Sequence, residues 1–132
     1  MTDASYGYTK NIGKMDFGGA VDKVTAALKE QGFGVLTEID VKATLKKKLD
    51  VDFRPYRILG ACNPPFAHKA LSSELLIGLL MPCNVVVFEE DDGTVAVSVI
   101  NPHEMFKVVE NPAVAPFAKE IDHKLKNVLE SL

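Results

Sequence analysis

Apolar positions recur along this chain with two different spacings, and the changes in spacing predict where helices and strands lie. Between Phe17 and Leu28 they recur every three or four residues, which gathers them on one face of a helix. Asp16 precedes this run as a cap for the first turn, and Gly32 follows it as a helix-ending glycine. We therefore predict an amphipathic helix between Asp16 and Gly32.

Five shorter runs contain the β-branched and aromatic residues, or the alternation, that are typical of strands. Their expected bounds are Tyr6–Ile12, Phe33–Ile39, Tyr56–Cys62, Asn84–Glu90 and Thr94–Ile100. The last two are separated by Asp91-Asp92-Gly93, and an Asp-Gly pair between β-branched runs predicts a hairpin.

Polar residues that precede helical patterns predict where the other helices begin. Asp40 can cap a second helix, in which Val41, Leu45 and Leu49 are expected to face inward. Asparagine followed by proline occurs three times, at residues 63–64, 101–102 and 111–112. Asparagine accepts hydrogen bonds from the unpaired N–H groups of a first turn, and proline has no N–H to leave unpaired. Each pair therefore predicts a helix entry.

The last helix is expected to become regular after Ala115, and its spacing predicts a core helix. Its apolar face comprises Phe117, Ile121, Leu125, Val128, Leu129 and Leu132. In the hairpin before it, both faces carry apolar residues, with Val95, Val97 and Val99 on one face and Ala96 and Ile100 on the other. One helical layer covers only one face of a sheet, so the second face is expected to be partly covered by the shorter helices or buried against a partner subunit, and of the two we favour a homodimer.

Composition narrows the class of protein. The chain has 132 residues, the size of a single domain spanning 1–132, with 47% hydrophobic and 25% charged residues. Its net charge of −3 argues against nucleic acid and anionic membrane surfaces as partners. The most apolar stretch, Leu75 to Phe88, is too short to span a bilayer and contains Pro82, and no secretory signal is visible. We therefore expect a cytoplasmic location.

Several residues that could form a functional site lie in the segment RILGACNPPFAHKAL, from Arg57 to Leu71. Cys62 lies just before a helix N-terminus, which favours a thiolate, although a lone cysteine that ends an apolar strand is more often an inert, buried side chain. Cys83 begins the next strand, and a domain of this size needs no disulfide, so both cysteines are expected to be free. The candidate functional site comprises Cys62, Asn63, His68 and Cys83, although the spacing of His68 matches no common zinc motif.

The direction of two strands decides whether these residues form a site. If the strands at Tyr56 and Asn84 are antiparallel neighbours, the end of one meets the start of the other, and Cys62 approaches Cys83. If a right-handed crossover makes them parallel, the two thiols lie at opposite ends of the sheet.

The sequence shows no glycine-rich phosphate loop, nucleophile elbow, metalloprotease helix or Cys-x-x-Cys motif, so catalysis, catalytic residues and cofactors stay unassigned. Lys46 to Lys48, with Arg54 and Arg57, allow a phosphate-ligand hypothesis. The favoured interpretation is a solvated helix face whose last-turn cations offset the helix dipole.

The segments GFGVLTEIDVKATLKKKLDVDFRPYRILGACNPPFAHKAL and IGLLMPCNVVVFE closely resemble the bacterial and archaeal family catalogued as domain of unknown function 302. The likeness extends from about Phe17 to the Asn-Pro pair after the last strand, and the matching positions are Cys62, Asn63, Pro64, Pro82 and Cys83. The resemblance implies an α+β fold of two layers, with a mostly antiparallel sheet backed by helices as in the TATA-binding-protein-like class, in the order β-α-β-α-β-α-β-β-α-α. It implies no known activity.

Three hypotheses for function follow. The first is a dimeric domain that binds a small-molecule ligand or serves as an accessory module, without catalysis of its own. The second is thiol-based redox chemistry or soft-metal binding by Cys62 and Cys83, with His68 as a possible third group. The third is phosphate-ligand binding through the helix that carries Lys46 to Lys48.

Overall fold

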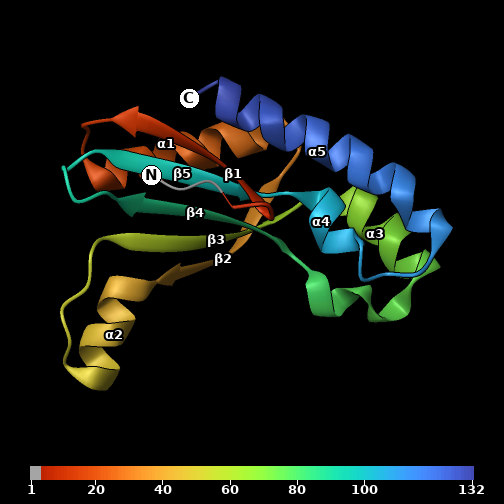
Figure 1. Cartoon of the computed structure of the whole chain (residues 1–132), viewed down its shortest axis with the longest axis horizontal. Helices are drawn as coiled ribbons and strands as arrows, with labels where there is room; N and C mark the ends of the chain where they lie inside the picture. The colour runs from red at the N-terminus through yellow and green to blue at the C-terminus, as the bar shows by residue number, and fades with distance from the viewer. Residues whose placement is uncertain (1–3) are drawn as a thin grey trace.

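Five strands form one fully antiparallel sheet in the computed structural model, which describes residues 4–132. The strands are β1 (Gly7–Gly13), β2 (Gly34–Asp40), β3 (Tyr56–Cys62), β4 (Cys83–Glu89) and β5 (Val95–Ile100). Their order across the sheet is β1-β5-β4-β3-β2, so the two strands that come first in the chain form its two edges (Figure 1). The α+β class and the predicted order of strands and helices are confirmed.

Two helices lie on one face of the sheet, and the others lie beyond its two ends, with α2 at the end opposite to α3 and α4 (Figure 1). Their bounds are α1 (Phe17–Glu30), α2 (Val41–Leu49), α3 (Pro64–Ser73), α4 (Pro102–Phe106) and α5 (Ala115–Glu130), with 3₁₀ turns η1 (Leu75–Leu80) and η2 (Pro112–Val114). The sequence pattern had predicted no element at η1. Helices α1 and α5 pack on the sheet, whereas α3, α4 and η1 lie beyond the end at which β3 stops and β4 starts.

The predicted caps explain most of the helix boundaries. The Asp16 side chain accepts a hydrogen bond from the Gly19 N–H at 2.9 Å, and Asp40 accepts one from the Ala43 N–H at 2.9 Å. Gly32, which follows α1, has a φ of +83°, a left-handed conformation that glycine adopts without a Cβ penalty. Asn101 and Asn111 cap their short helices in the same way as the two aspartates.

A single hydrophobic core lies between the sheet and the pair α1 and α5. Valines of β4 and β5 point into it, and Leu28 of α1 and Leu125 of α5 are fully buried against them. The core residues with the largest fully buried side chains are Phe33, Leu28, Leu59, Ile77, Leu125, Val24, Val85, Val87, Val95, Val97, Val99 and Val114. The predicted apolar faces of α1 and α5 are therefore the faces that meet the sheet.

Helix α2 departs from its prediction. It has no buried residue, Leu49 is 66% exposed, and Val41 and Leu45 are only partly covered. The helix projects from one end of the molecule beside the β2 edge instead of lying on the sheet (Figure 1). The inward orientation predicted for these three side chains was wrong because an amphipathic spacing does not guarantee that another element covers the apolar face.

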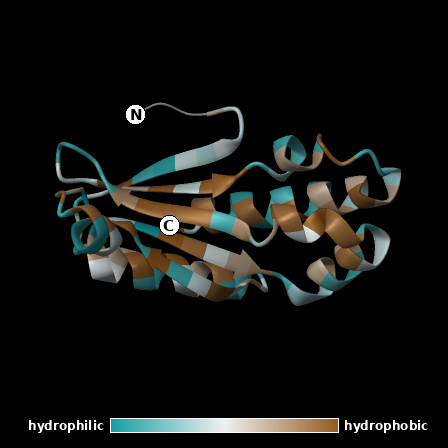
Figure 2. Cartoon of the chain, turned by 90° about the horizontal axis from the view of Figure 1, so that it is seen from below, coloured by the Kyte–Doolittle hydropathy of each residue, from teal (hydrophilic) through white to brown (hydrophobic). Residues whose placement is uncertain are grey.

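The face of the sheet away from α1 and α5 is covered partly by its own side chains. Tyr56 and Phe88, which are paired across β3 and β4, stack with ring centroids 5.5 Å apart, and Phe53 packs on Tyr56 at 6.2 Å. Ala96, opposite Phe88 on β5, is fully buried. Figure 2 shows the apolar central strands and the more polar β1 that follows the N-terminus.

Among residues 4–132, the structure contains no helix with the length and apolar character that crossing a membrane requires.

Candidate functional site

The last residues of β3 and the first residues of β4 lie together at one end of the sheet. The two strands are antiparallel, and Ala61 pairs with Cys83, so Cys62 follows directly after a residue that is bonded to the Cys83 position. The chain therefore reverses between these strands, as the antiparallel alternative predicted, and it brings both cysteines to the same end.

A small cavity occupies this end of the sheet, between the strands and helices α3, α4 and α5. Both cysteines and Asn63 line it. The rest of the lining is apolar and includes Phe33, Phe66, Met81, Met105, Phe106 and Ile121. Its volume is about 30 Å³, which holds a group of the size of one or two water molecules or the tip of a larger molecule.

The two cysteines occupy different environments within this site. Cys83 faces the core and is 9% exposed, whereas Cys62 is partly exposed, and both are free thiols. Burial, together with a smaller effect of the neighbouring Cys62, raises the pKa of the Cys83 thiol to about 11. Cys83 is therefore protonated near neutral pH and behaves there as a small apolar side chain.

Asn63 occupies the position before α3 without acting as the predicted cap. Its side chain accepts no N–H hydrogen bond from the first turn, in contrast to Asn101 and Asn111. The amide nitrogen instead donates a long hydrogen bond, 3.5 Å, to the backbone carbonyl of Gln31. The prediction that Asn63 caps the helix was wrong, and its side chain is a polar group in the wall of an otherwise apolar cavity.

His68 lies outside this arrangement. It is on the exposed side of α3 and is not among the residues that line the cavity. Within residues 4–132, no three side chains of histidine, cysteine, aspartate or glutamate are grouped closely enough to hold a metal ion. The structure thus brings together Cys62, Asn63 and Cys83 of the four predicted site residues.

The composition of the cavity wall favours an apolar occupant. A buried water molecule needs two to four polar partners, and the side chains of this wall supply mainly hydrocarbon, sulfur and the single Asn63 amide. An alkyl or thioether group fits the same space without unpaired hydrogen bonds. The site can therefore hold the apolar end of a ligand and offer one polar contact near its rim.

Comparison with known proteins assigns the chain to a family. Residues 8–132 match the family described as domain of unknown function DUF302. The chain belongs to the DUF302 family. The match begins at residue 8, within β1, whereas the resemblance in the sequence extends only from about Phe17.

A solved structure supports the DUF302 fold directly. The crystal structure of an uncharacterized conserved protein DUF302 from Bacillus stearothermophilus is similar, with 31% sequence identity and a TM-score of 0.86. The alignment covers 96% of this chain and 98% of that one. No similar protein was found among the curated proteins.

The cations of the phosphate hypothesis do not converge in this DUF302 structure. Lys46 forms ion pairs with Asp50 at 2.9 Å and Asp52 at 3.6 Å. Arg54 pairs with Asp91 at 3.0 Å, and Arg57 pairs with Glu38 at 2.6 Å. Carboxylates therefore neutralise three of the five cations of the hypothesis, and no observation brings these three together with Lys47 and Lys48 into one phosphate site.

One polar cluster of the DUF302 chain had no counterpart in the sequence analysis. Asp122 of α5 is 7% exposed and accepts a 2.6 Å hydrogen bond from the Tyr8 hydroxyl. Lys126 is 3.1 Å from the other carboxylate oxygen, and His103 is 3.8 Å from that oxygen. The only sequence signal was the i, i+4 spacing of Asp122 and Lys126, since Tyr8 and His103 approach only through the tertiary fold.

Burial and hydrogen bonds shift the pKa values of Asp122, Tyr8 and Lys126 in this cluster. Burial alone would raise the pKa of Asp122, but hydrogen bonds from Tyr8 and Lys126 outweigh it and hold that pKa below its ordinary value. Burial and the hydrogen bond to Asp122 raise the pKa of Tyr8. The hydrogen bond with Asp122 raises the pKa of Lys126. Asp122, Tyr8 and Lys126 therefore form a contact between β1 and α5 in which the charges of Asp122 and Lys126 compensate each other. None of the three lines the cysteine cavity.

Proposed function

We propose that this DUF302 chain is a binding module without catalysis of its own, and that its cavity receives the apolar end of a small molecule. The observation that carries the proposal is the cavity itself, in which Cys62 and Cys83 meet an apolar wall from three helices and two strands. Its small volume limits the bound part to a group such as a short alkyl chain or a thioether. The remainder of the ligand lies outside the cavity.

Asn63 gives the proposed site its polar contact. Asn63 is 9% exposed and lines the cavity. Its amide nitrogen donates one long hydrogen bond to the Gln31 carbonyl, and its side-chain oxygen accepts none of the hydrogen bonds that a helix cap would accept. A hydroxyl, amide or carboxylate beside the apolar end of the ligand can bond to it. Sites of this kind combine an apolar lining with few placed polar groups.

The proposed site is tested by titration with small apolar probes. We expect xenon, and straight-chain alcohols with about four to eight carbons, to shift the backbone NMR signals of residues around Cys62, Cys83 and Phe66. Ala67→Leu fills the space from α3 and is expected to abolish these shifts, because Ala67 lines the cavity. Ala27→Leu on α1 is the matched control, since Ala27 is also a partly buried helical alanine but lies outside the cavity.

Two outcomes of the titration would contradict the proposal. One is the absence of shifts around the cysteines at saturating probe. The other is an equal response in Ala67→Leu and Ala27→Leu, which would place the probe elsewhere. Circular dichroism of both variants confirms that each remains folded.

A second candidate function is thiol chemistry, favoured by the position of both free cysteines at one cavity. Burial and the raised pKa of Cys83 weigh against it, because the thiolate is the nucleophile and the metal ligand. The partly exposed Cys62 is then the group that would react first with an incoming electrophile or disulfide.

A further inference from the structure

One strongly exposed apolar surface lies on η1 and the turn after α4. Leu75, Leu76 and Leu79 are 79%, 71% and 84% exposed, and Val108 is 73% exposed. We call these four side chains the leucine patch. Leu76, Leu79 and Val108 line a hollow of about 320 Å³ whose wall also contains Glu74 and Glu110. Two carboxylates therefore lie beside the apolar side chains of the leucine patch.

A second exposed apolar surface follows the outer strand and α2. It comprises Leu36, Ile39, Leu49, Val51 and Phe53, which we call the α2 patch. Residues 36–54, which span this patch, contain five lysines and arginines and four acidic residues. Among residues 4–132, the ion pairs of the structure include neither Lys47 nor Lys48. Lys47 and Lys48 are therefore the cations beside the α2 patch that no carboxylate of these residues neutralises.

Helix α2 also lacks the packing that normally maintains a helix. It is nine residues long with no buried residue, and isolated helices shorter than about 12 residues are marginal in water. The Asp40 cap and the ion pair between Lys46 and Asp50 supply local support. Most helical stability in proteins comes from packing of an apolar face, and Leu49, which is 66% exposed, has little such packing within the chain.

We propose that a second copy of this chain covers both surfaces, with α2 of each copy packed against η1 of the other. Glu74 and Glu110 beside the leucine patch can meet Lys47 and Lys48 beside the α2 patch, a pairing of opposite charges across the interface. Apolar side chains occupy the centre of each. The inference goes beyond the proposed function and does not depend on it.

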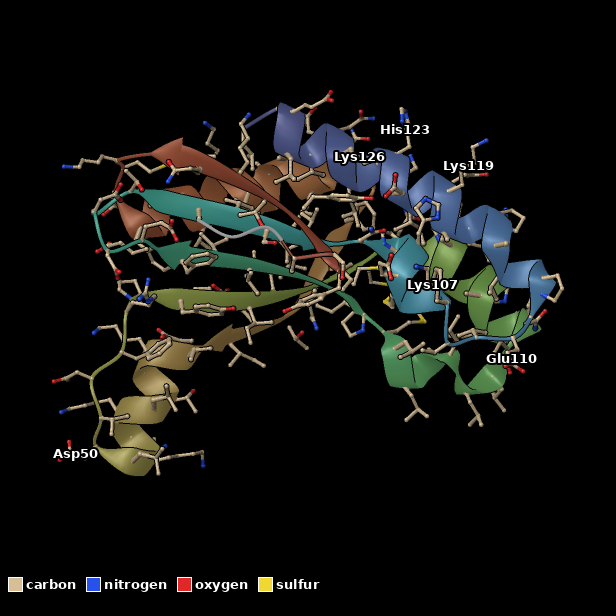
Figure 3. All side chains as sticks on the ribbon, in the orientation of Figure 1. Asp50, Lys107, Glu110, Lys119, His123 and Lys126 are labelled. Carbon is tan, nitrogen blue, oxygen red and sulfur yellow. The ribbon has the colours of Figure 1, made fainter. Side chains whose placement is uncertain are left out.

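The arrangement of the two surfaces fits a closed dimer. Helix α2 and η1 project from the same long side of the molecule, at its two ends, with the β2 edge between them (Figure 1). Figure 3 shows this separation by the labelled Asp50 at the end of α2 and Glu110 beside η1. Rotation of a second copy by a half turn about an axis on this side brings each α2 to the opposite η1. Both contacts then form at once, as in an isologous two-fold interface.

The exposed apolar area is sufficient for such a dimer. The two patches together contain nine side chains, each with about 100 Å² of exposed surface, or about 900 Å² per copy. A stable interface of ordinary size buries about 800 Å² per partner. The central strands β3 and β4 offer less on the far face of the sheet, because Tyr56, Ile58, Val86 and Phe88 are only partly exposed.

Sedimentation velocity at concentrations up to about 500 µM tests the dimer, because interfaces of this area dissociate in the micromolar range or below. We expect a monomer–dimer equilibrium with no larger species. Leu75→Lys with Leu79→Lys sets new cations opposite the lysines of α2 and should weaken association by about 100-fold or more. Lys47→Glu with Lys48→Glu should do the same by placing acids opposite Glu74 and Glu110.

Mixing the two double variants tests the reciprocal geometry. In a dimer of two copies of the same variant, both contacts between α2 and η1 are defective. A dimer of one copy of each variant keeps one contact intact, and in the other contact the new lysines of η1 face the new glutamates of α2. We expect heterodimers by native mass spectrometry where each variant alone is monomeric. Tyr6→Lys is the matched control, because Tyr6 is 66% exposed but belongs to neither patch.

Hydrogen exchange provides an independent measurement. Backbone amides of α2 should exchange slowly in the wild-type dimer and rapidly in the monomeric double variants, while α1 and α5 keep their protection. A wild-type chain that stays monomeric at the highest concentration would overturn the proposal. So would association that survives both double variants but is lost in Val86→Lys on the sheet face, or association that grows into open polymers.

Discussion

Burial makes the two cysteines chemically unequal although they line one cavity. A pKa of about 11 leaves about one in a thousand Cys83 thiols ionised at pH 8. Cys62 is partly exposed and is the last residue of β3, where it pairs with Gly34 of β2. Access and ionisation therefore both disfavour Cys83 as the reactive thiol.

We expect iodoacetamide at pH 8 to modify Cys62 at least about 10-fold faster than Cys83 in the native protein. Mass spectrometry of peptides from timed samples measures both rates, and urea-unfolded protein, in which the two should react alike, is the control. Comparable native rates would contradict the burial argument and favour the thiol-based alternative.

The Asp122 contact predicts a specific dependence of stability on pH. Because its pKa is lowered in the folded state, Asp122 stabilises the fold above about pH 4, and this contribution is lost as pH falls through the folded pKa. Asp122→Asn should lower the free energy of unfolding by about 1 to 3 kcal/mol at pH 7, with a smaller loss near pH 3.

Urea unfolding at the two pH values measures the difference for Asp122→Asn. Asp22→Asn on α1 is the matched control, since Asp22 is exposed and the structure gives it no ion pair within residues 4–132. A loss for Asp122→Asn that stays constant between pH 7 and pH 3 would show that its charge does not carry the effect.

At the scale of elements, β3 can approach its neighbours only because residue 60 has no side chain. A Cβ at Gly60 would overlap the Thr37 hydroxyl of β2 and lie 2.8 Å from Pro82, next to the cavity. Gly60 therefore sets how closely β2 and the start of β4 pack beside the site.

Gly60→Ala is expected to lower the free energy of unfolding by about 1 to 3 kcal/mol, the ordinary cost of overpacking. Gly34→Ala on β2 is the matched control, because a Cβ there meets no atom within 4 Å. Chemical denaturation compares the two variants, and equal stabilities would contradict the close approach at Gly60.

The helices and strands follow closely from local signals in the sequence. Asp16, Asp40 and Gly32 define helix ends through hydrogen bonds and backbone conformations that involve only neighbouring residues. Asn63 shows the limit of this reasoning, because it precedes proline as Asn101 does but bonds to α1 instead of its own helix. A local motif does not reveal which distant group competes for the side chain.

At the scale of the whole molecule, the sequence predicted the antiparallel meeting of Cys62 and Cys83 only as one of two alternatives. The cavity, the burial of Asp122 and the exposure of α2 depend on how whole layers are placed, which apolar spacing does not specify. The net charge of −3 does not show where charges lie, for example that Lys47 and Lys48 lie on α2 and Glu74 and Glu110 lie beside η1.

The placement of the first two strands at opposite edges of the sheet has a consequence for how the chain reaches its native state. Gly7 pairs with Ile100, so β1 can join the sheet only by closing a loop that contains residues 8–99. Closure of so long a loop is slow compared with the formation of a local hairpin. Until it occurs, the backbone of Val95–Ile100 offers unpaired N–H and C=O groups next to a valine-rich surface, which is a template for intermolecular aggregation.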